Sequence, residues 1–270
     1  MAYSLVLLLL FFLGASIGSF LSVAIYRIRN NKPGIFFGNS YCTSCKKHLN
    51  VKDLIPIISY LVTKGQCRHC KKAISPYYLF LEITTGLVFI ALFLKFPFLQ
   101  FIPPDNFIFT AAWFIPFLLY AIYSSFFIGI FFYDLQTKRI PDIFLFSLLP
   151  ISIIGSLILG SPQIWNMFVA GLIALIFFGG QIAVSKGKWL GEGDLYFSFS
   201  LAAIFGWQLL LVCITASYFI GALISIPLLL FANIKKDTPI PFAPFLIIGA
   251  FATIFFGNDL LSWYMDSITI

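Results

Sequence analysis

Long apolar runs separated by short polar stretches dominate the pattern of this 270-residue chain. Most runs reach about 18 residues, the length at which a helix crosses roughly 30 Å of hydrocarbon. Because hydrocarbon offers the backbone no hydrogen-bonding partners, unbroken runs of this kind favour helices over the alternating strands of a barrel. The predicted segments are Ser4–Tyr26, Tyr77–Phe96, Phe107–Tyr133, Ile143–Leu159, Ile164–Val184, Leu195–Phe205, Leu209–Phe231 and Phe242–Phe256.

The number of membrane crossings depends on the sixth and seventh segments. Leu195–Phe205 is short for a span, and Gly206 is the break between it and the next apolar run, so the two also fit one bent element. The pattern therefore predicts an all-α polytopic membrane protein with about eight transmembrane helices. It shows no internal repeat.

Composition excludes a water-soluble domain, since 60% of the residues are hydrophobic and only 10% are charged. A soluble protein needs more polar residues than this to cover its surface. The 34 Phe and 12 Tyr residues suit lipid-facing and interfacial positions.

The positions of the basic residues predict the orientation. No positive charge precedes the first segment, whereas Arg27 and Arg29 follow it directly, the reverse of a cleavable signal peptide. We therefore expect a retained anchor with its N-terminus outside the cell. Every Lys and Arg except Lys95 then falls on the cytoplasmic side, so the net charge of +7 reflects topology, and nucleic acid is not expected as a partner. The predicted cytoplasmic stretches are Arg27–Pro76, Asp134–Asp142, Ser185–Asp194 and Asn233–Pro241.

Four cysteines in the first cytoplasmic stretch form two C-x2-C pairs. Each pair presents two thiolates from a tight turn, and two pairs complete a tetrahedral Zn²⁺ shell with no open position, which predicts a structural zinc. Disulfides do not persist on a reducing face, so a redox or other metal site is the alternative. His48 and His69 are expected beside the metal, and Cys213 in the core of a helix. The pairs are Cys42 with Cys45 and Cys67 with Cys70.

Two acids lie where apolar segments meet the predicted cytoplasmic face. Asp134 ends the third segment and Asp194 opens the sixth, which places both at the same depth. Two carboxyl groups held close together share a proton, so one activates water as a general base while the other protonates a peptide carbonyl. Gly191 and Gly193 beside Asp194 would let a substrate backbone approach closely.

Structural roles explain the same acids equally well. Helix capping, or ion pairing with Lys138 and Arg139, also accounts for charges at a membrane boundary, and transporters carry such acids too. Asp142 suits an N-terminal cap of the next helix. Asp53 and Asp237 lie in loops, where an exposed charge is the simplest interpretation. From the residues alone, a catalytic pair and structural acids stay open.

Taken together, the motifs resemble the bacterial prepilin peptidases, the bifunctional leader peptidase and N-methyltransferase family of type IV pilus and type II secretion systems. The resemblance covers nearly the whole chain, and the order of the motifs makes it far more specific than a Gly-x-Gly-Asp string alone. The matching stretches are Gly18–Ile28, Asp53–Tyr60, Pro76–Gly86, Asp134–Asp142, Gly191–Asp194 and Ile240–Phe245.

The resemblance implies a catalytic pair, Asp134 and Asp194, supported by Pro141, Gly191 and Gly193. It implies prepilin and pseudopilin substrates with a basic leader and an apolar N-terminal helix, cut on the cytoplasmic face of the bacterial inner membrane after the glycine that ends the leader. It also implies methylation of the new N-terminus with S-adenosyl-L-methionine as the donor.

Glu82, a buried acid next to the zinc loop, is the candidate for the methyltransferase site, although a packing partner for a basic loop residue fits it equally well. On this interpretation residues 1–26 form the first transmembrane helix, 27–76 the methyltransferase-associated zinc loop and 77–270 the peptidase domain.

Two positions depart from the family's pattern. Tyr196 stands where a lysine commonly follows the second catalytic aspartate, and the usual tryptophan is missing, with Asn50-Val51 in that region. The missing tryptophan bears on methylation more than on proteolysis. Three functions stay open: a peptidase that also methylates, a peptidase alone, and a non-enzymatic assembly or transport protein that docks a partner through its zinc loop.

Overall fold

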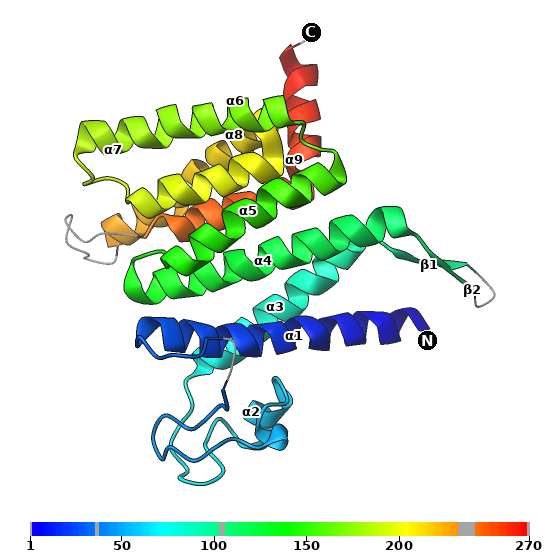
Figure 1. Ribbon diagram of the computed structural model, residues 1–270, viewed down its shortest axis with the longest axis vertical. Coiled ribbons are helices and arrows are strands. Elements are labelled where there is room, and N and C mark those ends of the chain that lie inside the picture. Colours follow the sequence, from blue (N-terminus) through cyan, green and yellow to red (C-terminus); the bar gives the residue numbers. More distant parts are fainter. Residues whose placement is uncertain (1, 36–37, 103–105, 232–240, 269–270) are drawn as a thin grey trace. The chain divides into compact units, whose positions relative to one another are not determined.

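The computed structural model describes residues 2–35, 38–102, 106–231 and 241–268. Within these residues, seven helices are long and apolar enough to cross a membrane. Contacts divide the chain into two compact units, Met1–Gly129 and Ile130–Ile270, and the boundary falls inside α4. The elements (Figure 1) are α1 (Ala2–Arg29), the 3₁₀ turn η1 (Val51–Asp53), α2 (Ile58–Val62), α3 (Pro76–Lys95), β1 (Leu99–Ile102), β2 (Asn106–Phe109), α4 (Ala111–Thr137), α5 (Asp142–Leu159), α6 (Ile164–Ala174), the π-helical η2 (Leu175–Gly179), α7 (Gly180–Ser185), α8 (Glu192–Phe231) and α9 (Ala243–Ile268).

In the first unit, glycines let α1 and α3 pack closely. A Cβ atom on Gly18 would lie 2.9 Å from the Cα of Glu82, and one on Gly86 would lie 2.7 Å from the ring of Phe11. Small residues at such contacts allow membrane helices to approach one another. Gly18 and Gly86 both belong to the recognised motifs, and their role in this structure is packing.

A short antiparallel hairpin separates α3 from α4. Leu99 pairs with Phe109, and the ring of Phe98 packs against those of Phe93 and Phe117. The predicted third helix began at Phe107, which was wrong, because α4 begins at Ala111. Aromatic and β-branched residues fit a strand as well as an apolar helix, so hydropathy alone does not separate the two.

In the second unit, α8 packs against α5, α6 and α9. The helix is broken at Gly206, whose φ of 68° and ψ of 179° lie in a region that favours glycine. A Cβ atom there would also lie 2.9 Å from the Cβ of Pro162. The predicted segments Leu195–Phe205 and Leu209–Phe231 are therefore two helical parts of one bent element.

The other spans follow the apolar runs with shifted ends. The predicted segment Ile164–Val184 corresponds to α6, η2 and α7 in continuous succession. Helix α9 extends past the predicted end at Phe256 to Ile268, and its last turns expose Trp263. The predicted loop with Lys235, Lys236 and Asp237, together with Ile240 of the last motif, lies outside the described residues.

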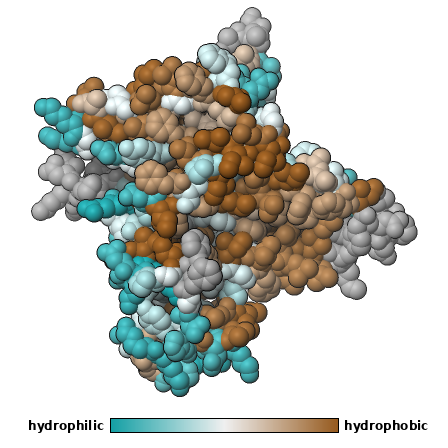
Figure 2. All heavy atoms as spheres, viewed as in Figure 1, coloured by the Kyte–Doolittle hydropathy of each residue, from teal (hydrophilic) through white to brown (hydrophobic). Residues whose placement is uncertain are grey.

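Polar surface gathers on one segment of the first unit. The cysteine loop, residues 30–75 between α1 and α3, carries most of this unit's exposed charges. Figure 2 shows hydrophobic side chains covering the helices and hydrophilic ones covering this loop. This distribution is that of membrane helices with an extramembrane segment.

Candidate active site and metal centre

Asp134 and Asp194 come together in the second unit. Asp134 lies in the last turn of α4 and Asp194 in the first turn of α8, and their side chains are 4% and 8% exposed. The two carboxyl groups are close enough for their charges to interact. The fold thus brings two acids that are distant in sequence to one buried place at the ends of two membrane helices.

The turn before α8 fixes the Asp194 side chain. The Gly191 N–H donates a hydrogen bond of 3.3 Å to Oδ2 of Asp194, and the Asp194 N–H donates one of 3.2 Å to the Gly191 carbonyl. Asp194 therefore closes a small ring with its own backbone at the helix N-terminus. This end of a helix favours negative charge.

The loop after Asp134 packs onto that turn. The Lys138 N–H donates to the Asp134 carbonyl at 2.7 Å, and Lys138 takes a left-handed φ of 54° that ends α4. Ile140 then lies against Gly193, where a Cβ atom would come 3.3 Å from the Cβ of Ile140. Pro141 is buried and precedes α5. The two predicted catalytic blocks are therefore in direct contact.

Two neighbouring residues differ from their expected roles. Asp142 is exposed and is the first residue of α5, while Pro141 occupies the N-cap, so the prediction of Asp142 as the cap was wrong. Its charge still suits the first turn of a helix. Tyr196, where the family commonly has lysine, is 46% exposed and packs against Phe146 with ring centroids 6.3 Å apart.

Two polar side chains near Asp194 were not predicted from the sequence as part of the site. The Tyr218 hydroxyl of α8 donates a 2.9 Å hydrogen bond to Oε1 of Gln181, and Tyr218 is close enough to Asp194 for an electrostatic interaction. Gln181 follows η2, and such π-helical turns are frequent at functional sites. In the sequence, both are uncharged polar residues inside apolar runs. Such residues indicate a functional site less strongly than a charge in the same position does.

The four paired cysteines form one cluster in the first unit. All four are free thiols, and their Sγ atoms lie within 4.8 Å of one another, with 3.9 Å between Cys42 and Cys70. A tetrahedron of Zn–S bonds has sulfur atoms about 3.8 Å apart, so the cluster fits a metal ion. The backbone amide of Cys45, the largest influence, lowers the pKa of the Cys42 thiol to about 6, which favours the thiolate that a metal binds.

The two C-x2-C turns have the same backbone conformation. In each, the amide of the first cysteine donates to the carbonyl five residues later at 2.9 Å. Lys46 and Lys71, which follow the second cysteines, both have a φ of 60°. The expectation of no internal repeat was therefore wrong at this short scale, since a C-x2-C-K-K unit occurs twice. The repeat gives the cluster two equivalent halves.

An ion pair ties the segment between the turns to the second turn. Asp53 Oδ1 lies 2.6 Å from Nε of Arg68, which stands between Cys67 and Cys70. Asp53 also accepts a 3.1 Å hydrogen bond from the Asn50 N–H. The Asp53 side chain is 11% exposed, so the interpretation as a solvated loop charge was wrong.

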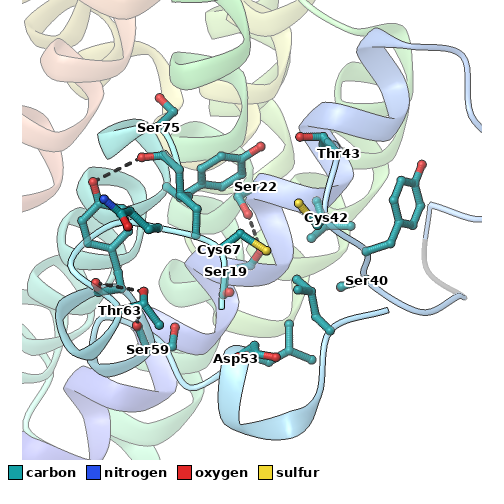
Figure 3. A pocket seen from close by; sticks show the side chains of 18 of the residues that line it. Ser19, Ser22, Ser40, Cys42, Thr43, Asp53, Ser59, Thr63, Cys67 and Ser75 are labelled. Atoms are coloured by element: carbon teal, nitrogen blue, oxygen red, sulfur yellow. Dashed lines mark hydrogen bonds between the residues drawn. The ribbon is translucent and has the colours of Figure 1, made fainter. Parts of the chain in front are cut away.

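Glu82 lines a cavity of about 450 Å³ between α1, the cysteine loop and α3. Figure 3 shows other parts of its wall, with Ser19 and Ser22 from α1 and Cys42 and Cys67 from the loop. The Glu82 side chain is 8% exposed, and its Oε2 accepts a 2.7 Å hydrogen bond from the backbone N–H of Ile57. The sequence left open that Glu82 packs against a basic loop residue, whereas this hydrogen bond joins it to a backbone amide. Ile57 has φ 63° and ψ −54°, a strained conformation for a β-branched residue. Glu82 thus holds a strained segment of the loop against α3.

Two family models match the chain. The bacterial peptidase A24 N-terminal domain matches residues 12–96, and the type IV leader peptidase family matches residues 121–226. No solved structure gives a significant match.

Several relatives are named prepilin leader peptidase/N-methyltransferase. The one from Bacillus subtilis (strain 168) is 29% identical over 95% of this chain and 97% of its own. Those from Aeromonas salmonicida (strain A449) and Pseudomonas aeruginosa are each 25% identical, over 96% and 94% of this chain and 94% and 91% of their own. Because one family model spans the cysteine cluster, the other spans both aspartates and the relatives match almost end to end, the chain belongs to the type IV leader peptidase family.

Proposed function

We propose that this chain is a membrane aspartic endopeptidase that removes the basic leader from type IV prepilin-like proteins and then methylates the new N-terminal residue. The observation that carries the proposal is the buried pair of Asp134 and Asp194 at the ends of two membrane helices. The names of the relatives supply the substrate class and the second activity.

The chemistry follows from two neighbouring carboxyl groups that hold one proton between them. The ionised carboxylate takes a proton from a water molecule, whose oxygen attacks the scissile carbonyl carbon, while the protonated carboxyl donates its proton to the carbonyl oxygen. When the tetrahedral intermediate collapses, the C–N bond breaks, the leaving amine takes a proton from the protonated carboxyl group, and a hydroxyl of the intermediate gives its proton to the other carboxylate, so the pair again holds one proton. Burial of both groups strengthens these electrostatic interactions.

The turns around the pair provide the support. Gly191 positions the Asp194 carboxyl, and Gly193 lets Ile140 bring the two catalytic blocks into contact. Pro141, buried beside Ile140 in sequence, is the N-cap of α5. The exposed carboxylates of Asp142 and Glu192 begin α5 and α8. Their negative charges would attract a basic leader toward the pair. Asp237, another acid of the predicted cytoplasmic stretches, would add to this attraction and lies outside the described residues.

The cysteine cluster would hold a structural Zn²⁺. Its four thiolates fill a tetrahedral shell, so the ion organises the loop and has no position left for a substrate. The exposed lysines on both turns offset the charge of four thiolates.

The cavity beside Glu82 would hold the methyl donor, S-adenosyl-L-methionine. Its volume of about 450 Å³ lies in the range of small-ligand sites. The carboxylate of Glu82 suits a cationic ligand, and the rings of Tyr26 and Tyr78 on its wall suit cation–π contact and stacking. When bound, the donor would supply the activated methyl group.

The orientation completes the proposal. The distribution of basic residues supports an orientation with the cysteine loop and both aspartates on the cytoplasmic side of a bacterial inner membrane and the N-terminus outside. A prepilin would then present its basic leader at the cytoplasmic face while its apolar helix stays in the bilayer.

Co-expression with one prepilin tests the proposal, with the mass of the pilin as the readout. The wild type should yield a shortened pilin that carries one added methyl group. Asp134→Asn and Asp194→Asn should each leave the leader in place at unchanged membrane levels, and Asp259→Asn, at an exposed acid of α9, is the matched control. Normal processing by either of the first two variants would refute the catalytic pair. A shortened but unmethylated pilin would leave a peptidase alone.

A further inference from the structure

Exposed aliphatic side chains cluster on the cysteine loop. Four residues of and just before α2 are 40% to 66% exposed, although the loop around them is polar. In Figure 2 a hydrophobic patch interrupts the polar surface where Figure 1 places α2. We call this patch the α2 apolar face; it consists of Ile55, Ile58, Leu61 and Val62.

The opposite side of the same segment faces the protein. Ser59, Tyr60 and Thr63 line the cavity beside Glu82. Short as it is, α2 therefore has one side on the cavity and one side exposed. Such an amphipathic segment requires a second environment for its apolar side.

The position of α2 along the membrane helices α1 and α3 indicates that this second environment is the lipid bilayer. The Ile57 N–H is bonded to Glu82, which lies ~9 Å past the start of the membrane helix α3 at 1.5 Å per residue. Gly18 packs against the same residue, ~16 Å before the end of α1. Along the helix axes, the residues next to Ile57 therefore lie short of the ends of α1 and α3 that join the cysteine loop, at the level of the membrane-spanning helices. Figure 1 shows the loop lying alongside α1 rather than beyond its end.

We propose that α2 is an in-plane membrane anchor whose apolar face enters the boundary between lipid headgroups and acyl chains. Segments with one apolar and one polar side lie in the membrane interface in this way. Lys52 and Lys64 flank the face and are exposed, so their ammonium groups reach anionic headgroups. The anchor would fix the outer wall of the cavity against the bilayer.

Quenching of a fluorophore by lipid tests the anchor in the full-length protein. An environment-sensitive fluorescent amino acid is introduced by codon suppression at Leu61, and in a matched variant at Lys47, an exposed residue of the first cysteine turn. Both are reconstituted without substrate in nanodiscs of phosphatidylethanolamine and phosphatidylglycerol with brominated acyl chains. Bound zinc shows that each loop is folded.

The anchor predicts several-fold stronger quenching at Leu61 than at Lys47. It also predicts weaker quenching at Leu61 when phosphatidylcholine replaces phosphatidylglycerol, because Lys52 and Lys64 lose their anionic partners. Equal quenching at the two positions would overturn the proposal, as would shielding of Leu61 by a second copy of the chain, detected as a cross-linked dimer. The readout requires no enzymatic activity, so its result is independent of the proposed peptidase.

Discussion

Ile140 lies against Gly193, and this contact joins the block that follows Asp134 to the turn that holds Asp194. A methyl group on Gly193 would come 3.3 Å from the Cβ of Ile140 and 3.4 Å from its Cγ1 and Cδ1. Such distances are tighter than most contacts of a Cβ atom, so the Ile140 side chain or its block would have to shift by a few tenths of an ångström. The fit between the two blocks that carry the carboxyl groups is therefore sensitive to a side chain at position 193.

Gly193→Ala should lower the cleavage rate by about tenfold, since overpacking costs ~1–3 kcal/mol and shifts the aspartates. Single-turnover cleavage of a purified prepilin measures the effect. Combining Gly193→Ala with Ile140→Ala removes Cγ1 and Cδ1, two of the three close atoms of Ile140, and leaves room for the new methyl group to shift, so it should restore part of the rate. Wild-type rates in the single variant would show that the contact does not position the pair.

Gly206→Ala should destabilise the second unit. The φ of 68° disfavours a side chain, and the new methyl group would meet Pro162. Strain of this kind costs roughly 1–3 kcal/mol. Thermal unfolding in detergent measures the loss, with Gly171→Ala as the matched control, since a Cβ atom at Gly171 meets nothing within 4 Å. Equal melting of the two variants would contradict a fixed bend at Gly206.

Cys67→Ser should abolish zinc binding, because a four-thiolate site loses one of its ligands. Metal analysis after dialysis against a weak chelator is the measurement. Cys213→Ala is the control: Cys213 is a buried thiol of α8 outside the cluster, and this variant should keep its zinc. Retention of zinc by Cys67→Ser would exclude the four-cysteine site.

Glu82→Gln should separate methylation from cleavage. The amide oxygen still accepts the hydrogen bond from Ile57, so the loop stays in place, but the charge facing the cavity is lost. Binding of the methyl donor, measured by equilibrium dialysis, should weaken by about tenfold or more, and the pilin should be cut but not methylated. Unchanged donor binding would remove Glu82 from that site.

Features that depend on residues close together in the sequence could be predicted from it. Apolar runs located the membrane helices because a span needs a continuous apolar length, and the cysteine spacing located the cluster because each C-x2-C turn is local. Asp134 and Asp194 stood out because a charge at the end of an apolar run is costly. Their proximity was then inferred from their common membrane face.

Features that depend on tertiary contacts were not predictable. The Glu82–Ile57 hydrogen bond joins residues far apart in sequence and sets the depth of the cysteine loop. Gly206 marked a break in the sequence, but hydropathy could not decide between two separate spans and one bent element, because apolar residues flank the glycine on both sides. The Asp53–Arg68 ion pair could not be predicted, because the two residues come together only in the folded cysteine loop. Propensity and periodicity carry no information on such partners.

The most direct test of the central claim compares single-turnover prepilin cleavage by Asp134→Asn, Asp194→Asn and the double variant. Two carboxyl groups that share one proton act as a unit, so each single variant should fall to the background rate and the double variant should be no slower. The pair would be contradicted if the double variant cleaved more slowly than either single variant by the product of the two separate rate reductions. Near-wild-type cleavage by either single variant would contradict it as well.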